Sequence, residues 1–199
     1  MKDTEQQSRS FDGELLGGQS FESCVFKSCT FVACQLESAT FHACQFESCD
    51  FTRAAFNDAR LKGCVFAQCN FTDAIFFAAH LEGTHLIACR FNGADLRAIK
   101  VEACDWSFST LRLQDLSGLD LQKIKLVEAD LYGSDLSKTD LRKADFSRSV
   151  LAQAKFDESD LRGANLEGID LRQTSFTKAR IDLGQAILLA QSHGAIVDG

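Results

Sequence analysis

Large apolar residues recur at every fifth position from Phe11 to Ile181, without an insertion or a deletion. Each position of this series carries Phe, Leu, Ile, Val or Trp. Neither an α-helix, with about 3.6 residues per turn, nor a strand, with a period of about 2, would put every fifth residue on one side. A coil with four short sides would, because each side points its central residue inward and residue i then stacks on residue i+20. The pattern therefore predicts an all-β solenoid over residues 11–181.

The residue two places before each centre is also expected to point inward, and it is mostly small. Four large centres nearly fill one coil, so only small side chains fit beside them. All nine cysteines occupy this position: Cys24, Cys29, Cys34, Cys44, Cys49, Cys64, Cys69, Cys89 and Cys104. We expect them to be buried, reduced and to act as small hydrophobic groups, because no CxxC pair is present and their spacing is a multiple of five. No cofactor or metal site is expected, since His80 and His85 should point outward from successive sides.

The pattern becomes less regular from Ile99 to Ile124. The inner small position turns bulky at Ile99, Gln114, Leu119 and Ile124, so these coils should differ in cross-section. Apolar residues also fall at positions that should face solvent, namely Phe108 and Leu113 and a second set of Ile75, Phe77 and Ile87. Two interpretations are open for both sets: they contact a partner, or a locally distorted coil tucks them in.

The two ends of the chain break the five-residue pattern. Residues 1–10 form a polar segment without the apolar core of a signal peptide. Residues 182–193 predict a short helix ended by Gly194, which would cap the exposed end of the solenoid. The tail, residues 182–199, carries more apolar surface than one helical stripe needs, so it is expected to be a dimerisation module. The candidate interface residues are Leu183, Ala186, Ile187, Leu188, Leu189, Ala190, Ile196 and Val197.

The chain is acidic, with 28 Asp and Glu against 21 Lys and Arg and a net charge of −7. This balance repels nucleic acid at long range and favours basic protein partners. No stretch approaches the ~18 apolar residues of a membrane span, so neither a membrane nor DNA is expected as a direct partner and we place the protein in the cytoplasm. A filled solenoid offers no cleft in which an acid and a base could act together, so no enzymatic activity is expected.

Three segments resemble the A(D/N)LXX unit of the pentapeptide repeat family: Ala94-Asp95-Leu96-Arg97, Ala129-Asp130-Leu131-Tyr132-Gly133 and Ala164-Asn165-Leu166-Glu167-Gly168. The resemblance covers roughly residues 9 to 183 and implies a right-handed quadrilateral parallel β-helix. The tail, with Ala186, Leu188, Leu189, Gly194, Ile196, Val197 and Gly199, is similar to that of the topoisomerase-protecting members, which include quinolone-resistance, mycobacterial, microcin-immunity and albicidin-resistance proteins. Several quinolone-resistance members carry loops that interrupt the register, and this chain has none.

This second resemblance implies a function for the solenoid. It implies a twofold dimer whose rod is similar to B-DNA in width and acidity, which would bind DNA gyrase and lower its sensitivity to a poison such as albicidin or a quinolone. The outward aspartates would then form the gyrase-binding surface: Asp95, Asp105, Asp115, Asp120, Asp130, Asp135, Asp140, Asp145, Asp160 and Asp170. Two alternatives stay open: these aspartates serve turns and solubility, or the chain is a scaffold for another protein partner.

Overall fold

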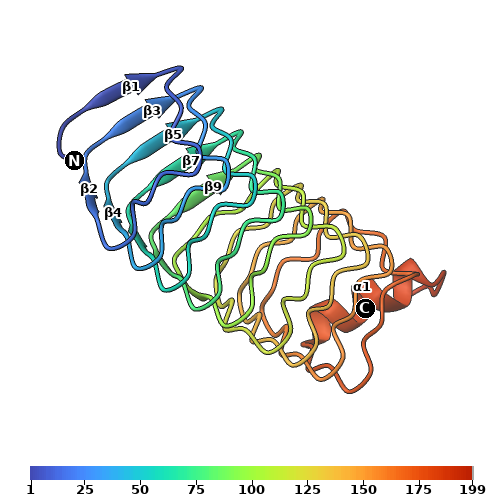
Figure 1. Cartoon of the computed structure of the whole chain (residues 1–199). Coiled ribbons are helices and arrows are strands. Elements are labelled where there is room, and N and C mark those ends of the chain that lie inside the picture. The colour runs from blue at the N-terminus through green and yellow to red at the C-terminus, as the bar shows by residue number, and fades with distance from the viewer. Residues whose placement is uncertain (199) are drawn as a thin grey trace.

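The protein is a rod made of successive coils of one chain, closed at its carboxyl end by a helix (Figure 1). The computed structural model describes residues 1–198. Its strands are β1 (Glu5–Gln7), β2 (Ser20–Glu22), β3 (Val25–Lys27), β4 (Thr40–His42), β5 (Gln45–Glu47), β6 (Arg60–Lys62), β7 (Val65–Ala67), β8 (His80–Glu82), β9 (His85–Ile87) and β10 (Lys100–Glu102), followed by helix α1 (Leu183–Ser192). The prediction of a right-handed four-sided parallel β-helix with a helical cap is confirmed.

The strands form two parallel sheets on adjacent sides of the rod. Their orders are β1-β3-β5-β7-β9 and β10-β8-β6-β4-β2. Each strand pairs with residues twenty places away, as Phe26 does with Phe46, so the predicted register is confirmed. After β10 the coils are joined through isolated parallel bridges, such as Asp120 to Asp140.

We number the four sides by their central residues. The centres of face 1 are Phe11 and every twentieth residue after it. The centres of faces 2, 3 and 4 start at Leu16, Phe21 and Phe26, respectively, and also repeat every twenty residues. The sheet of β2 to β10 therefore lies on face 3, and the sheet of β1 to β9 lies on face 4.

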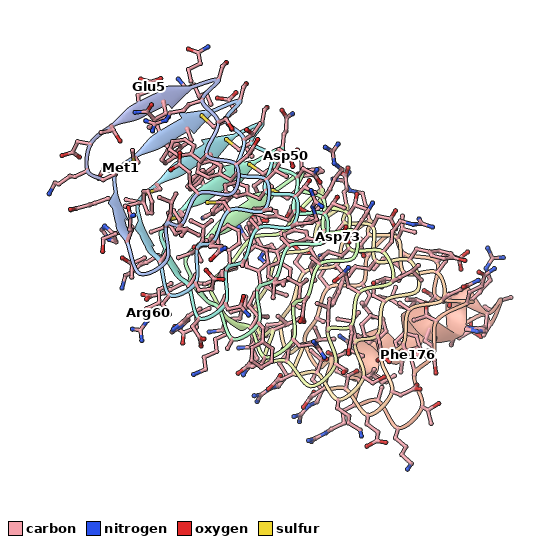
Figure 2. The ribbon with its side chains drawn as sticks, viewed as in Figure 1. Met1, Glu5, Asp50, Arg60, Asp73 and Phe176 are labelled. Atoms are coloured by element: carbon pink, nitrogen blue, oxygen red, sulfur yellow. The ribbon has the colours of Figure 1, made fainter. Side chains whose placement is uncertain are left out.

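The core runs along the whole rod and contains both predicted inward positions. Phenylalanine rings of one face stack in parallel from coil to coil, as Phe46 does on Phe66 with ring centroids 4.4 Å apart and 4° between the planes. All nine cysteines are buried beside these centres, as predicted, and Figure 2 shows their sulfur atoms inside the amino-terminal half. Their thiols donate to backbone carbonyls, for example Cys69 Sγ to the Phe46 oxygen at 3.5 Å. The cysteines thus fill space and also satisfy backbone acceptors.

The solenoid begins earlier than residue 11. β1 pairs with β3 through Glu5 and Val25, and the Met1 ammonium group donates to the Ser20 carbonyl oxygen at 2.6 Å. The sequence placed residues 1–10 outside the solenoid because Gln6 stands where an apolar centre is expected. Backbone pairing continues without that centre, since pairing with the next coil satisfies the polar groups of both segments.

The carboxyl-terminal cap agrees with its prediction in position and in its signals. Asp182 caps helix α1, and Gln185 completes a capping box with it. Gly194 follows the helix with a φ of 84°, a left-handed conformation that glycine adopts without strain. The Gln185 side chain is buried against the last coils, where it donates to the carbonyl oxygens of Leu161 and Ala164. The cap is therefore fixed to the solenoid by hydrogen bonds.

The irregular region contains an interruption of the backbone ladder, which we call the seam. Within residues 1–198, no backbone hydrogen bond joins residues 92–103 to residues 112–123, which lie one coil further. The ladder is present on both sides of the seam, because Phe76 donates its N–H to the Asp95 oxygen and Leu116 donates to the Asp135 oxygen, each at 2.8 Å. We expected the coils of this region to differ from the others, and the difference is a local loss of backbone hydrogen bonds between two coils.

The distorted coil does not tuck in the outward apolar residues. Phe108 and Leu113 are 52% and 73% exposed, and both sit at corners with a left-handed backbone. Ile75 and Phe77 are 39% and 45% exposed, while Ile87 is half-buried. The coil therefore does not bury Phe108 and Leu113, and contact of these residues with a partner stays a prediction.

Candidate protein-binding faces

Each of the ten predicted surface aspartates has a structural role in a turn. One carboxylate oxygen of each accepts the backbone N–H of the residue two places later, at 2.9 to 3.2 Å. Such turns close the corner after the centre and satisfy an N–H that the coil leaves free. All ten aspartates therefore have the geometry expected if they serve the turns. DNA mimicry would depend on the negative charge that these carboxylates still present to solvent.

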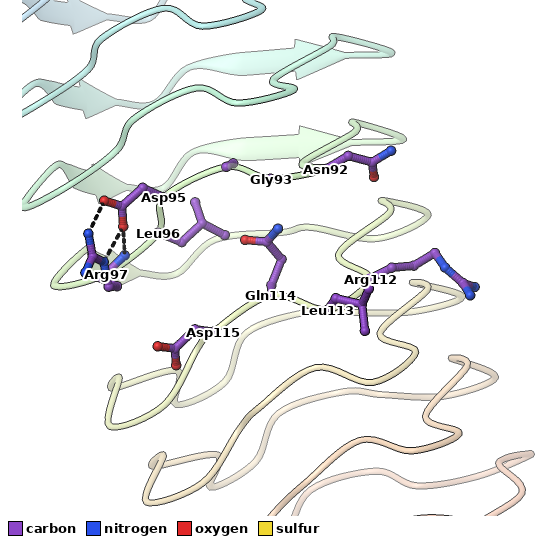
Figure 3. A pocket seen from close by; sticks show the side chains of 10 residues that line it. Asn92, Gly93, Asp95, Leu96, Arg97, Arg112, Leu113, Gln114 and Asp115 are labelled. Carbon is purple, nitrogen blue, oxygen red and sulfur yellow. Dashed lines mark hydrogen bonds and ion pairs between the residues drawn. The ribbon is translucent and has the colours of Figure 1, made fainter.

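Six of these aspartates also lie beside a cation. Arg97, Arg142, Arg162 and Arg172 each turn back onto the aspartate two residues earlier, and Figure 3 shows the pair of Asp95 and Arg97. Asp130 pairs with Arg112 at 2.9 Å, and Asp105 lies 3.7 Å from Lys125. The repeated sequence Asp-Leu-Arg signals this pairing, and the sequence reasoning missed it. These pairs cancel much of the local negative potential.

The arginines also change the acidity of their partners. Hydrogen bonds from Arg162 lower the pKa of Asp160 to about 2, and those from Arg172 lower the pKa of Asp170 to about 2. The pKa values of Asp95 and Asp140 are lowered for the same reason. These carboxylates are therefore ionised at any physiological pH, but each of them is paired with a positive charge.

Four of the ten aspartates have no ion-pair partner among residues 1–198: Asp115, Asp120, Asp135 and Asp145. Asp115 bridges to Asp135 on face 2, and Asp120 bridges to Asp140 on the adjacent face 3. Asp145 lies on face 4, where it accepts a hydrogen bond from Asn165. Three of these four unpaired aspartates therefore lie on two neighbouring sides of the rod, faces 2 and 3.

The predicted dimer residues divide into an outer and an inner set. Leu183, Leu188, Ile196 and Val197 are exposed, with Ile196 90% and Leu183 78% accessible. Ala186, Ile187, Leu189 and Ala190 are half-buried, and Leu189 packs against the core of the solenoid. Part of the helix therefore closes the end of the rod, and the outer set is the apolar surface that a second copy would cover.

Two surface notches of the rod lie along the seam. One notch of about 660 Å³ lies between two coils, with Asp95 and Arg97 on one rim and Asp115 on the other (Figure 3). A second, of about 440 Å³, contains His85 and Asp105. Within residues 1–198, no three His, Cys, Asp or Glu side chains come together as metal ligands. His80 and His85 lie on β8 and β9 of different sheets.

Among the residues that the structure describes, no helix is both long and apolar enough to cross a membrane.

Comparisons with known proteins agree with this architecture. Two models match the sequence: a pentapeptide repeat region over residues 39–122, and pentapeptide repeats over residues 115–153 and 154–182. Full-length QnrB1, a plasmid-mediated fluoroquinolone resistance protein, is 22% identical with a TM-score of 0.87 over 98% of this chain and 99% of its own. A trypsin-treated variant of QnrB1 is 25% identical with a TM-score of 0.72, over 99% of both chains. No curated protein matches the sequence.

Proposed function

Because the chain belongs to the pentapeptide repeat family, we propose that it is a homodimeric protein that binds DNA gyrase or a related type II topoisomerase and lowers its sensitivity to a poison. The observation that carries the proposal is the likeness to a fluoroquinolone resistance protein over nearly the whole of both chains. The carboxyl-terminal tail gives a second support, because its sequence is similar to that of the family members that protect topoisomerases.

The surface supports binding where the enzyme would otherwise hold DNA. The rod has a net charge of −7, and its unpaired aspartates Asp115, Asp120 and Asp135 lie on faces 2 and 3. A basic DNA-binding groove would attract these unpaired carboxylates by the same electrostatic term that attracts phosphates. The mimicry we propose therefore depends on these two faces, and the arginine-paired aspartates contribute less.

The first experiment measures gyrase supercoiling and poison-stabilised cleavage complexes with increasing amounts of the protein. We expect fewer cleavage complexes at low concentration and inhibition of supercoiling in excess. Binding should weaken as salt rises and should compete with linear duplex DNA. If gyrases from several bacteria neither bind at low salt nor change activity with excess protein, the topoisomerase proposal is wrong and a scaffold for another partner replaces it.

A set of charge variants separates the effect of the unpaired aspartates on faces 2 and 3 from the effect of the total charge. Replacing Asp115, Asp120 and Asp135 by Asn keeps the turns, because the amide oxygen can still accept the backbone N–H. Each exposed charge contributes only about 0.2 to 1 kcal/mol, so all three are replaced together. The matched control changes Glu47, Asp73 and Glu167, which lie on faces 1 and 4, to Gln or Asn. Equal weakening by both sets would show that net charge, and not the two faces, determines binding.

The dimer is tested at the outer apolar set of the tail. Leu183→Asp combined with Ile196→Asp should give a monomer, because an unpaired charge buried in an interface is strongly unfavourable. These residues are exposed in the single chain, so the cap should remain intact, whereas Leu189 packs against the core and would confuse the test. Light scattering measures the mass. A wild-type monomer at micromolar concentration would contradict the extended double rod.

A further inference from the structure

The seam lies mainly on two sides of the rod, faces 2 and 3. It begins after Phe91, which donates its N–H to the Thr110 oxygen at 3.0 Å, and ends before Trp106, which donates to the Lys125 oxygen at 2.8 Å. Residues 92–103, which have no backbone bond to the next coil, include the centres of faces 2 and 3. Face 4 keeps its bonds, including that from Phe108 to Val127 at 2.9 Å. Face 1 keeps the bonds from Phe91 to Thr110 and from Thr110 to Cys89, and lacks only the bond from Gly93 to Arg112. The interruption is therefore one-sided.

Bulky inner residues explain why the coils part there. Ile99 and Leu119 occupy successive levels of the inner column of face 3, where the flanking levels carry the smaller Ala79 and Thr139. Both are buried, so two large side chains share an interior that elsewhere admits small ones. Overpacking of this kind is relieved by movement of the backbone, and the bonds between coils are lost.

Gln114 has a similar effect on face 2. At the equivalent place one coil later, the Ser134 hydroxyl donates to the Leu111 carbonyl oxygen at 2.8 Å, and the Gln114 amide makes the same link to the Phe91 oxygen at 2.7 Å. The glutamine side chain is longer by two bonds, so it makes this link across a greater separation of the coils. The open coil boundary is thus held by a specific hydrogen bond.

We propose that the seam is a bend point, about which an amino-terminal block of residues 1–110 and a carboxyl-terminal block of residues 111–192 rock on the edge between faces 4 and 1. Each block has an unbroken stacked core, and near this edge the blocks are joined by the bonds from Trp106 and Phe108. As the blocks move, the gap between the coils on faces 2 and 3 opens or closes. The volumes of the two notches, about 660 and 440 Å³, change with it. The bend point follows from the packing and does not depend on the proposed function.

Amide hydrogen exchange of the full-length protein tests the open ladder. The N–H groups of Leu96 and Asp115 face the seam without a backbone partner, whereas Phe76 and Asp135 make the equivalent bonds at closed coil boundaries. We expect Leu96 and Asp115 to exchange at least ~100-fold faster than Phe76 and Asp135. Equal protection of the four amides would show that the seam is closed in solution and would overturn the inference.

Distances between paired spin labels test the motion itself. One pair, at Asn57 and Ser137, spans the seam on face 2, and the control pair, at Glu47 and Val127, spans the same four coils on face 4. With labelled chains diluted in unlabelled protein, rocking about the closed edge should make the face 2 distribution at least ~2-fold broader than that of face 4. Equal widths on both faces would contradict a bend point, even if the exchange is fast.

A variant with the flanking residue types should remove the bend. Ile99→Ala, Gln114→Ser and Leu119→Thr together give the inner positions the residue types of Ala79, Ser134 and Thr139 in neighbouring coils. We expect the face 2 distribution to narrow to that of face 4 and the Leu96 amide to become protected. Persistent breadth in a folded variant would show that these side chains do not cause the seam. If the variant does not fold, the two wild-type measurements still decide the inference.

Discussion

Gln185 donates its side-chain amide to the carbonyl oxygen of Ala164 at 2.8 Å, across the boundary between the helical cap and the solenoid. The same amide donates to the Leu161 oxygen, and its own oxygen accepts the N–H of Asp182 at 3.0 Å. One buried side chain thus begins the helix and also donates to two carbonyls at the end of the rod. The Leu161 carbonyl accepts the Ala164 N–H as well, whereas the Ala164 carbonyl has no further coil to pair with.

Removing this amide should destabilise the cap. Gln185→Leu leaves the carbonyl of Ala164 buried without a donor, whereas the Leu161 carbonyl still accepts the Ala164 N–H at 2.8 Å. We expect the free energy of unfolding to fall by about 1 to 3 kcal/mol. Gln191→Ala, at an exposed position of the same helix, is the control and should change stability by less than about 0.5 kcal/mol. Chemical denaturation followed by circular dichroism measures both, and equal effects would contradict the role of Gln185.

The stacked phenylalanines should contribute more to stability than the cysteines beside them. Phe46 lies between Phe26 and Phe66, with ring centroids 4.9 and 4.4 Å away, so Phe46→Ala should cost about 3 to 5 kcal/mol through lost burial and a cavity. Cys69→Ala removes one buried sulfur and should be mild. A similar loss in both variants, measured by denaturant unfolding, would show that the small inner position is as tightly packed as the centre.

The native thiols should be almost unreactive. The thiolate is the form that reacts, and burial raises the pKa of Cys34 to about 12 and that of Cys104 to about 11. A hydrogen bond with Cys64 lowers the pKa of Cys44 to about 7, but the Cys44 side chain is fully buried, so a reagent cannot reach it. At pH 8 a soluble disulfide reagent should therefore modify none of the nine cysteines rapidly in the folded protein, but all nine after denaturation. Rapid labelling of several of them in the native state would contradict the register of the solenoid.

Removing Arg162 should raise the pKa of Asp160. Arg162→Gln takes away the main cause of the low value, so the Asp160 carboxyl should titrate nearer to its ordinary pKa of 3.8, while Asp170 stays at about 2. Titration of the carboxyl carbons by NMR measures both groups. Because the folded pKa is depressed, the pair stabilises the protein above about pH 4, and this contribution is lost as the pH falls toward 2. If the pKa of Asp160 does not change, its low value comes from the backbone hydrogen bond of the turn and not from the Arg162 side chain.

The five-residue period was sufficient to predict the class of fold, the register and the burial of the cysteines, because residues such as Phe26 and Phe46 can share one side only in a four-sided coil. The helix was also predictable, since Asp182 and Gly194 mark its two ends. The first coil was missed because it is held by backbone pairing of β1, which Gln6 does not reveal.

The surface was less predictable than the core. That Ile99 and Leu119 would alter the coil was evident from their size, but whether the backbone or the side chains would yield depends on packing that spacing alone does not describe. The ion pairs were missed because the aspartates were considered without the arginines two residues later. Asp140 and Arg142 belong to one turn, and their charges have to be read together.

The turn made by each outward aspartate has a consequence for how this surface can change during evolution. The corner requires an oxygen that accepts an N–H, and Asn165 meets that requirement with an amide, accepting from Glu167 at 3.0 Å. Aspartate and asparagine therefore support the same turn, but only aspartate adds a negative charge to the electrostatic field around the rod. Selection can add or remove charge at one coil after another without affecting the core, so one scaffold can be adapted to partners of different electrostatic character.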